Sequence, residues 1–455
     1  MEEIHIYHTN DLHSHFEHWP RIHELLVSRR KWHTEVGEDV FMFDIGDHMD
    51  RWHPLSDGTR GKGNTTLLNK AGYDAATIGN NEGITLPFKD LNTLYDDATF
   101  QVLVANLYTE DGKHPQWVKP YSIYKTKSGI KLGVIGLTAY FSHFYHLLGW
   151  RLTNPLEELS AQLENLKEKA DIIILLSHLG INEDEQIAEQ FPEIDVILGA
   201  HTHHILHEGK LINNSLLGAA GKFGMYVGHV RLQVDPITKQ LIHKKAILYD
   251  SNKLPFLDNE DVMISELYEN GKSILSKEIA KVPEEIKNKH DMAAMLCSAL
   301  MEWCEADCAF LNKGLILKDL EKDVVTPYDL LSICPHPINP CVVELSGVEL
   351  KEVLTQTLNE KWADLQLKGL GFRGTVMGSI VYAGITIFKG SKGLNIKINN
   401  EELVREKIYR LAIPDMFTFG RFFPEIHRAK HKTYYLPEFL RDLIEWKLKS
   451  GKDCS

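Results

Sequence analysis

Short apolar runs alternate with helical patterns along the first half of the chain, and this alternation predicts a layered α/β domain. Most runs are rich in β-branched or other large apolar residues and end at a polar or glycine-containing turn. The candidate strands are residues 4–9, 40–45, 75–78, 101–107, 131–138, 171–177 and 195–200. A helix is expected over residues 155–170, which have proline at the start and apolar residues at i, i+3 and i+4. Residues 226–250 predict a hairpin at the edge of the sheet.

The pattern breaks at the polar stretch 250–262, and a different arrangement follows. Residues 262–281 have a helical pattern, and the remainder mixes helical stretches with glycine-rich strands, which is typical of an α+β domain. We therefore expect a first domain at residues 1–255, a linker helix at 256–282 and a second domain at 283–455.

Composition narrows the range of partners. The chain has 455 residues, of which 43% are hydrophobic and 25% are charged, as in an ordinary soluble globular protein. The net charge of −13 argues against a nucleic-acid backbone or an anionic membrane surface as partner. A small phosphate substrate stays compatible with this charge if metal ions supply positive charge locally. The oligomeric state is left open by the sequence.

The compartment is expected to be the cytoplasm. The chain opens with acidic residues and then a strand, without the basic start and apolar segment of a signal peptide. No run approaches the roughly 18 apolar residues that a membrane helix needs. The six cysteines match neither a zinc motif nor a disulfide framework, so they are expected to be reduced and mostly buried.

Oxygen and nitrogen donors follow several of the predicted strands. In an open α/β sheet, ligands gather beyond the carboxyl ends of the strands, so these side chains are expected to lie in one region. The candidate metal ligands are Asp11, His13, Asp47, Asn80, His178, His201 and His203. Imidazole and carboxylate together suit Mn, Zn, Fe or Co, and the lack of thiolate disfavours a purely structural zinc site. A carboxylate such as that of Asp47 can bridge two ions, as in two-metal hydrolases.

The motif series resembles that of the calcineurin-like metallophosphoesterases, and more closely the 5′-nucleotidase family. The matching segments are HTNDLHSH, DIGD, GYDAATIGNNE, SHLG and GAHTH, in that order. The resemblance implies a four-layer α/β catalytic domain followed by an α+β 5′-nucleotidase-like domain. It also implies that two divalent ions share Asp47 and that a metal-bridging hydroxide attacks phosphorus in line. One ion would be held by Asp11, His13, Asp47 and His203, and the other by Asp47, Asn80, His178 and His201.

One position departs from the family's pattern. Members usually carry histidine directly after the metal-binding asparagine, where it is thought to stabilise the transition state and assist the leaving oxygen, but this chain has Asn81. An amide can donate a hydrogen bond to a developing oxyanion, yet it cannot transfer a proton. General acid catalysis typically contributes about 10²–10⁴-fold, so we expect a preference for anhydrides over monoesters. His48, beside Asp47, is a candidate replacement for the missing proton donor.

The second domain resembles the part of the family that holds a nucleobase between aromatic rings. The candidate substrate-binding residues are Phe422, Phe423, Phe372, Arg373 and Asn312. Stacking on an aromatic ring binds any base, so the sequence does not identify which base or sugar is preferred. A cluster of aromatic residues is also compatible with a hydrophobic core, and this alternative stays open.

The function expected from these features is a two-metal phosphohydrolase that cleaves phosphate ester or anhydride bonds of nucleotides or related compounds. One alternative is a cyclic-nucleotide phosphodiesterase built on the same metal site. Another is a non-catalytic sensor or scaffold that binds metal without turnover. The complete ligand set favours the enzyme.

Overall fold

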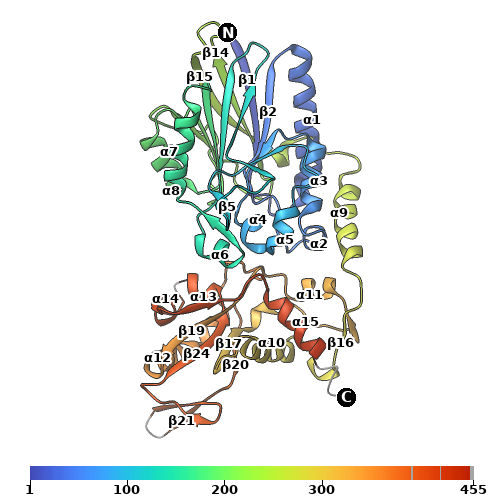
Figure 1. The fold of residues 1–455 in the computed structure, drawn as a ribbon. Helices are drawn as coiled ribbons and strands as arrows, with labels where there is room; N and C mark the ends of the chain where they lie inside the picture. The colour runs from blue at the N-terminus through green and yellow to red at the C-terminus, as the bar shows by residue number, and fades with distance from the viewer. Residues whose placement is uncertain (391–392, 421, 451–455) are drawn as a thin grey trace. The chain divides into compact units, whose positions relative to one another are not determined.

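The computed structural model describes residues 1–390, 393–420 and 422–450. They divide into two compact units, Met1–Gly271 and Lys272–Ser455 (Figure 1). The division falls within α9 (Glu260–Ile274), which takes the place of the expected linker helix at 256–282. Most of α9 belongs to the first unit because Glu260 accepts two hydrogen bonds from the buried Arg21 guanidinium, at 2.7 and 2.5 Å. Gly271 also packs closely on the backbone of Leu55.

The first unit contains two large sheets. One has seven strands in the order β15-β14-β1-β2-β3-β4-β6. Its strands β1, β2, β3, β4 and β6 are parallel to one another, whereas β1 pairs antiparallel with β14. The strand bounds are β1 Glu2–Thr9, β2 Asp39–Asp44, β3 Ala75–Ala76, β4 Gln101–Leu103, β6 Val118–Lys119, β14 Tyr226–Val234 and β15 Leu241–Asp250. The predicted hairpin is confirmed, since β14 and β15 pair antiparallel and β15 is the edge strand.

The other sheet has six strands in the order β12-β13-β11-β10-β8-β7. Their bounds are β7 Tyr121–Lys125, β8 Lys131–Leu137, β10 Ile172–Ser177, β11 Val196–Gly199, β12 Lys210–Ile212 and β13 Ser215–Gly218. Strands β8, β10, β11 and β13 are parallel, so their carboxyl ends lie along one edge.

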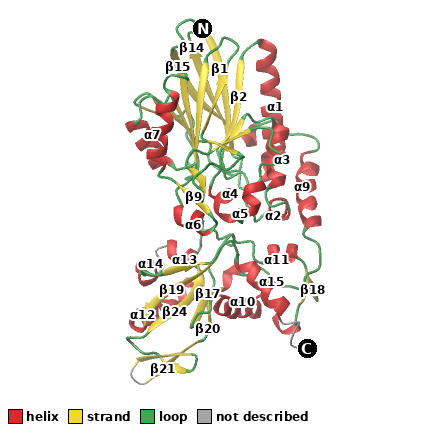
Figure 2. Ribbon diagram, in the orientation of Figure 1, coloured by secondary structure: helices red, strands yellow, loops and turns green. Residues whose placement is uncertain are grey.

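Four layers result from the packing of these sheets. Residues such as Ile6 and Phe43 from the first sheet meet Ile174 and Leu198 from the second in one hydrophobic core. The far side of the second sheet packs on apolar residues of α7 and α8, whereas α1 lies along the far side of the first sheet (Figure 2). The helices of this unit are α1 Trp19–Val36, α2 Pro54–Gly58, α3 Lys62–Ala71, α4 Asn80–Thr85, α5 Phe88–Thr93, α6 Ser142–Leu147, α7 Pro155–Leu166 and α8 Ile181–Gln190. The predicted four-layer α/β architecture is confirmed.

The predicted strand at 101–107 is shorter in the structure. It ends at Leu103, and Leu107 starts a separate short strand, β5 (Leu107–Thr109), which pairs with β9 (Trp150–Leu152). Between them the buried Asn106 exchanges hydrogen bonds with the backbone of Thr138 at the end of β8. The chain therefore leaves the seven-stranded sheet for the separate two-stranded sheet β5-β9 within the segment predicted as one strand.

The second unit is the expected α+β domain. Its main sheet has the order β20-β17-β24-β19-β25, with bounds β17 Cys308–Asn312, β19 Pro340–Ser346, β20 Ile380–Ala383, β24 Ile408–Pro414 and β25 Lys432–Tyr434. A smaller sheet contains β21 Ile385–Gly390, β22 Gly393–Ile398 and β23 Glu401–Glu402, and β16 Ala280–Lys281 pairs with β18 Val324–Val325. The helices are α10 Lys289–Trp303, α11 Pro327–Ile333, α12 Gly347–Thr357, α13 Met416–Phe419, α14 Pro424–Arg428 and α15 Leu440–Ser450.

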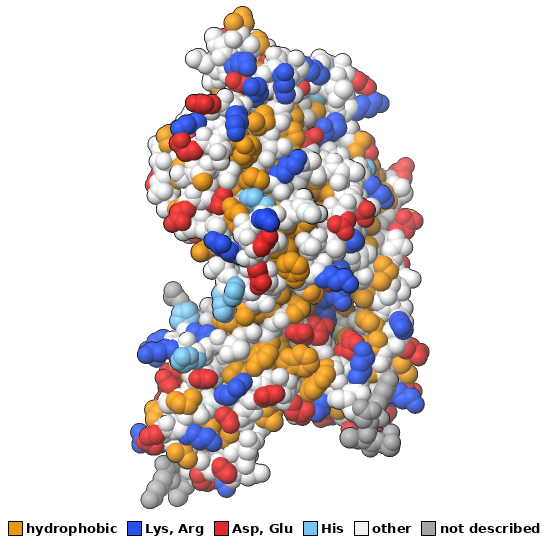
Figure 3. All heavy atoms as spheres, in the orientation of Figure 1, with side chains coloured by type: hydrophobic (Ala, Val, Ile, Leu, Met, Phe, Trp, Pro, Cys, Tyr) orange, Lys and Arg blue, Asp and Glu red, His pale blue; other side chains and the backbone are white. Residues whose placement is uncertain are grey.

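Three further features of the described residues concern the surface charge, the apolar character of the helices and the cysteines. Acidic and basic side chains are interspersed on the face drawn in Figure 3, so the net charge of −13 is not concentrated there. None of the helices within the described residues has the length and apolar character needed to cross a membrane. The five cysteines of the described ranges are free and buried, as expected, and Cys454 lies outside them.

Candidate metal centre

The loops that carry the expected ligands have an unusual backbone. Asp11, His13, Asp47, His201 and His203 all have positive φ angles, between 50° and 68°. Non-glycine residues adopt this conformation in only a few per cent of cases, and strain of this kind clusters at functional sites. Five of the seven expected ligands therefore stand on backbone that the surrounding structure must hold in place.

One group of donors forms around Asp11, His13 and His203. The Asp11 Oδ1 atom lies 3.4 Å from His203 Nε2 and 3.8 Å from His13 Nε2, and the two Nε2 atoms are 3.2 Å apart. The Asn10 amide donates a hydrogen bond to Asp11 Oδ2 at 2.8 Å, which fixes the carboxylate. The three donors converge closely enough to hold one ion.

A second group shares Asp11 and adds Asp47 and His178. The His178 Nε2 atom lies 3.5 Å from Asp47 Oδ2 and 3.9 Å from Asp11 Oδ1. The other ring nitrogen, Nδ1, faces the Ile45 carbonyl oxygen at 2.6 Å, which leaves Nε2 directed at the carboxylates. Asp47 Oδ2 is also 3.7 Å from His13 Nε2, so each carboxylate reaches both groups.

The electrostatics of this cluster favour a bound cation. Burial alone would lower the pKa of His178, but Asp47 and Asp11 raise it to about 10. Burial likewise opposes ionisation of Asp47, yet His178 and His13 hold the pKa of its carboxyl well below the ordinary value. The two fully buried carboxylates thus create a field that attracts positive charge to the position between them.

Asn80 and His201 lie at the border of the cluster. Asn80 begins α4, and its Oδ1 atom is buried without a hydrogen-bond partner among the described residues, as is His178 Nε2. His201 donates its backbone N–H to the Asp11 carboxylate, and its ring lies 5.4 Å from that of His178. A buried oxygen and a buried nitrogen without protein partners are what a site for a cation provides.

Glu82 ties two of the ligand loops together, and sequence reasoning missed it. Its carboxylate accepts hydrogen bonds from the backbone N–H groups of Asp47, Met49 and Gly79, at 2.8–3.1 Å. Gly79 must be glycine, because a Cβ there would lie 2.1 Å from Asp47 Oδ1. The available signal was a glutamate three residues after the strand-ending glycine, which is the spacing of a capping interaction.

Asn81 is buried, and its side chain does not face open space. Its amide nitrogen lies 2.7 Å from His13 Nδ1, and its backbone N–H donates to Asp47 Oδ1 at 2.7 Å. His13 Nδ1 also lies 3.7 Å from Asp50 Oδ2, a carboxylate that the sequence analysis did not single out. The residue expected to contact substrate is therefore in contact with an expected metal ligand.

His48 does not join the cluster in any contact that the described residues show. Its ring packs edge-on against Trp19 at 5.1 Å, and Nδ1 lies 3.2 Å from the Asn64 amide. Burial lowers the pKa of His48 to about 3, so the ring is neutral near neutral pH. A neutral imidazole is too weak an acid to serve as a general acid. This placement argues against the donor role that the sequence suggested.

Three of the five expected substrate-binding residues are buried in the second unit. Phe423 is fully buried among Phe310, Phe417 and Trp362, in the position of a core residue. The Phe372 ring stacks on His336 at 5.0 Å, with the planes 4° apart. The Asn312 side chain donates to the Met377 carbonyl at 2.9 Å.

The two other candidates are partly accessible. Phe422 is half-buried and lies near Phe417 and Trp362. Arg373 is also half-buried, and its backbone N–H donates to His336 Nδ1. The alternative left open by the sequence, an aromatic core, thus describes Phe423 and Phe372, and only Phe422 keeps the exposure that stacking on a base requires.

Comparisons with known proteins agree with this architecture. The profile of the calcineurin-like phosphoesterases matches residues 4–204, and that of the 5′-nucleotidase C-terminal domain matches residues 276–421. An uncharacterized metallophosphoesterase, YunD of Bacillus subtilis, is 43% identical over 98% of this chain and 99% of its own length. A 5′-nucleotidase of Vibrio cholerae is 25% identical over 97% of this chain and 90% of its own.

Solved structures show the same fold at low sequence identity. The NAD nucleotidase NadN of Haemophilus influenzae has a TM-score of 0.68 at 16% identity, covering 98% of this chain and 96% of its own. The 5′-nucleotidase precursor of Thermus thermophilus has a TM-score of 0.60 at 18% identity, covering 99% and 97%. The likeness therefore extends over both units.

Proposed function

The chain belongs to the calcineurin-like metallophosphoesterases that carry a 5′-nucleotidase C-terminal domain, and it is therefore a metal-dependent hydrolase of phosphate esters; from this premise we propose that it cleaves phosphate bonds of nucleotides or related compounds. The observation that carries the proposal is the convergence of Asp11, Asp47 and His178 with His13 and His203. The nucleotide part is supported by the second profile and by relatives that are named as nucleotidases.

We propose that the two donor groups hold the two divalent ions. The residues fit, because the carboxylates are buried, and Nε2 of His178 and Oδ1 of Asn80 have no hydrogen-bond partner among the described residues. Bound ions would supply a Lewis acid for the phosphoryl group and lower the pKa of water toward neutrality. Asp47 and Asp11 both lie between the groups, so either carboxylate is positioned to serve as the bridge.

Asn81 is proposed to position His13. If His13 directs Nε2 to the metal, its Nδ1 carries the proton and needs an acceptor. Rotating the Asn81 amide by half a turn presents its oxygen to Nδ1, and the two ends of an amide are chemically distinct but equal in shape. In this role Asn81 orients the metal ligand His13 through a direct contact and supplies no proton.

The lack of a proton donor at this position bears on the substrate. In hydrolysis of a nucleoside monophosphate the nucleoside departs as a basic alkoxide, which benefits most from protonation. In hydrolysis of an anhydride the leaving group is a phosphate, which departs without protonation. We therefore expect nucleoside diphosphates or nucleotide sugars to be hydrolysed faster than nucleoside monophosphates.

A panel of substrates tests the proposal. The purified protein, loaded with Mn²⁺, would be incubated with AMP, ADP, UDP-glucose or a 2′,3′-cyclic nucleotide. The products of each reaction would be separated and quantified by chromatography, and the bound metal would be measured. Turnover of a diphosphate or nucleotide sugar well above that of AMP supports the proposal. Turnover of the cyclic nucleotide alone would favour a phosphodiesterase, and two bound ions without any turnover would favour a sensor.

A matched variant tests the expected preference for anhydrides over monoesters independently of the two-metal assignment. Asn81→His restores the residue that the family usually has, so it is expected to raise AMP hydrolysis more than ADP hydrolysis. Rapid AMP hydrolysis by the unaltered protein, equal to that of ADP, would contradict the preference while leaving the two-metal assignment intact.

A further inference from the structure

A second group of histidines lies on the first unit, toward the other end of β1. Residues of this strand alternate: Ile4 and Ile6 enter the core between the sheets, while Glu3, His5 and Tyr7 occupy the opposite face. His5 lies six residues before Asp11, which is about 20 Å along an extended strand. The group is therefore separate from the candidate metal centre.

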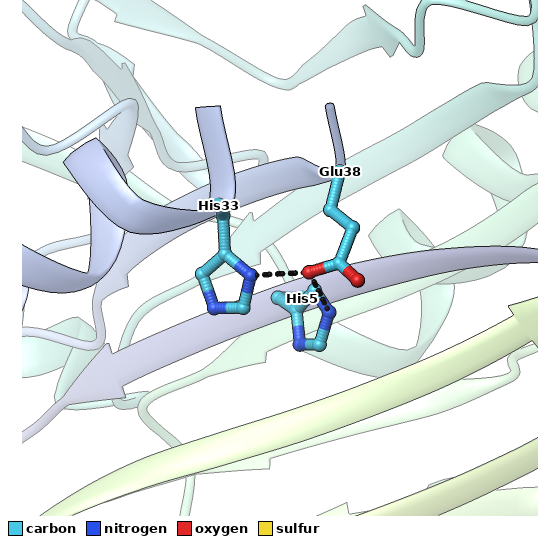
Figure 4. A group of neighbouring side chains, drawn as sticks. All are labelled: His5, His33 and Glu38. Carbon is cyan, nitrogen blue, oxygen red and sulfur yellow. Dashed lines mark hydrogen bonds and ion pairs between the residues drawn. The ribbon is translucent and has the colours of Figure 1, made fainter. Parts of the chain in front are cut away.

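Two histidines of this group, His5 and His33, both lie close to the Glu38 carboxylate. Glu38 Oε2 lies 2.8 Å from His33 Nδ1, at the end of α1, and 3.2 Å from His5 Nε2. Figure 4 shows a nitrogen of each imidazole ring pointing at the same carboxylate oxygen. A tetrahedral zinc ion with bonds of about 2.0–2.1 Å places neighbouring ligand atoms about 3.3 Å apart. This is close to the 3.2 Å between His5 and Glu38 and about 0.5 Å longer than the 2.8 Å between His33 and Glu38, and all three ligand atoms lie within 4.8 Å of one another.

The remaining ring nitrogens have neutral partners, as in established metal sites. The Tyr7 hydroxyl lies 3.0 Å from His33 Nε2, and His229 Nε2 lies 3.0 Å from His5 Nδ1. A metal-binding histidine usually engages its other ring nitrogen in a hydrogen bond that fixes the ring. His5 Nε2 is buried and has no hydrogen-bond partner among the described residues, although Glu38 Oε2 lies 3.2 Å away. Its lone pair is therefore available to a metal ion.

We propose that His5, His33 and Glu38 form a binding site for one divalent cation of the zinc class, separate from the catalytic ions. Zn²⁺, Co²⁺ and Ni²⁺ accept two imidazoles and a carboxylate, and a fourth position is open to water or to Glu3. Glu3 Oε2 lies 3.7 Å from His5 Nε2 but also 3.7 Å from Arg231. The bound ion would fasten the end of α1 to β1.

Protonation and access are compatible with this role. Burial lowers the pKa of His5 to about 4 and also lowers that of His33, so both rings are neutral near neutral pH, the form that binds metal. The side chains of Glu38 and Glu3 are about one third exposed and give an ion a path from solvent. Arg231 contributes an opposing charge, but its side chain is 42% exposed and can turn outward.

The test removes the catalytic ions first. In the full-length double variant Asp11→Asn/Asp47→Asn, both donor groups of the catalytic centre lose their carboxylates. After equilibration with micromolar free Zn²⁺ and removal of the excess, we expect about one zinc per chain and a higher unfolding temperature with zinc than without. Adding Glu38→Gln should bring the retained zinc close to zero. The control Glu35→Gln, which changes an exposed residue in the last turn of α1, should change nothing.

Two outcomes would overturn the inference. One is that the double variant retains no zinc; the other is that Glu38→Gln retains as much as its control. Co²⁺ provides a second readout, because a tetrahedral site gives intense visible absorption that Glu38→Gln should abolish. Glu38→Gln alone is expected to leave phosphohydrolase activity unchanged, so a failure of this inference is distinguishable from a failure of the proposed function.

Discussion

The strand-end loops of the first unit and the aromatic residues of the second unit were both predicted from the sequence, but they behave differently. The loops were predicted from their place after apolar runs, and the aromatic residues from a family resemblance. In the first unit, Asp11, His13, Asp47, His178 and His203 converge within ion-binding distance. In the second, Phe423, Phe372 and Asn312 are buried and engaged in packing or hydrogen bonds. A donor placed directly after a parallel strand has its location set by topology, whereas the direction of an aromatic ring depends on distant neighbours.

The largest expected effect comes from removing the carboxylate of Asp47, which lies near His178 of one donor group and His13 of the other. Asp47→Asn should lower kcat by at least about 10³-fold, because loss of metal stabilisation costs several kcal/mol and each 1.36 kcal/mol is tenfold. The measurement is phosphate release with Mn²⁺, together with bound metal per chain. Full activity in Asp47→Asn would show that Asp47 is not an essential metal ligand. The contrast between the two units would then fail.

Phe423 tests the other side of the comparison. Phe423→Ala is expected to destabilise the second unit by about 3–5 kcal/mol, because a fully buried ring leaves a cavity. The control is Phe419→Ala, which removes a ring that is 44% exposed and should cost far less. Chemical unfolding measures both. A stable Phe423→Ala protein with a raised KM for nucleotide would instead assign this ring to substrate binding.

Asn81 gives an intermediate effect. Asn81→Ala removes the contact to His13, and losing such an orienting partner typically costs about 10–100-fold in metal affinity or activity. The Asp50 carboxylate, 3.7 Å from the same nitrogen, can take over part of the role and keep the loss at the lower end. Metal affinity and kcat should fall together for monoesters and anhydrides alike. A loss confined to monoesters, with metal binding unchanged, would indicate direct contact with the leaving group.

The sequence was sufficient for the α/β character of the first unit and for the placement of candidate ligands after strands, because apolar periodicity and strand-end motifs are local. It was not sufficient for side-chain direction. His48 is adjacent to Asp47, yet its ring packs on Trp19, and Asn81 turns toward His13. Glu82 reaches Asp47 and Met49, and Glu38 reaches His5, through tertiary contacts, which spacing along the chain does not encode.

His336 gives the smallest effect and sharpens the view that Phe372 and Arg373 are part of a packed structure. Burial lowers the pKa of His336 to about 3, below the ordinary value of 6.5, so the folded unit holds it neutral. Below pH 6.5 the unfolded chain takes up a proton that the folded one does not, and stability falls as pH decreases. Between pH 6.5 and 5.5 this contributes about 1 kcal/mol.

The measurement compares wild type with His336→Gln, which retains hydrogen-bonding groups for the Leu315 carbonyl and the Arg373 N–H. The comparison is needed because burial raises the pKa of Asp415 in the same unit to about 8, and its contribution to stability rises as pH falls over this range. That contribution is common to both proteins and cancels. The wild type should therefore lose about 1 kcal/mol relative to the variant between pH 6.5 and 5.5. An unchanged difference would mean that His336 and its stacked partner Phe372 are open to water, and Phe372 would return as a candidate for binding a base.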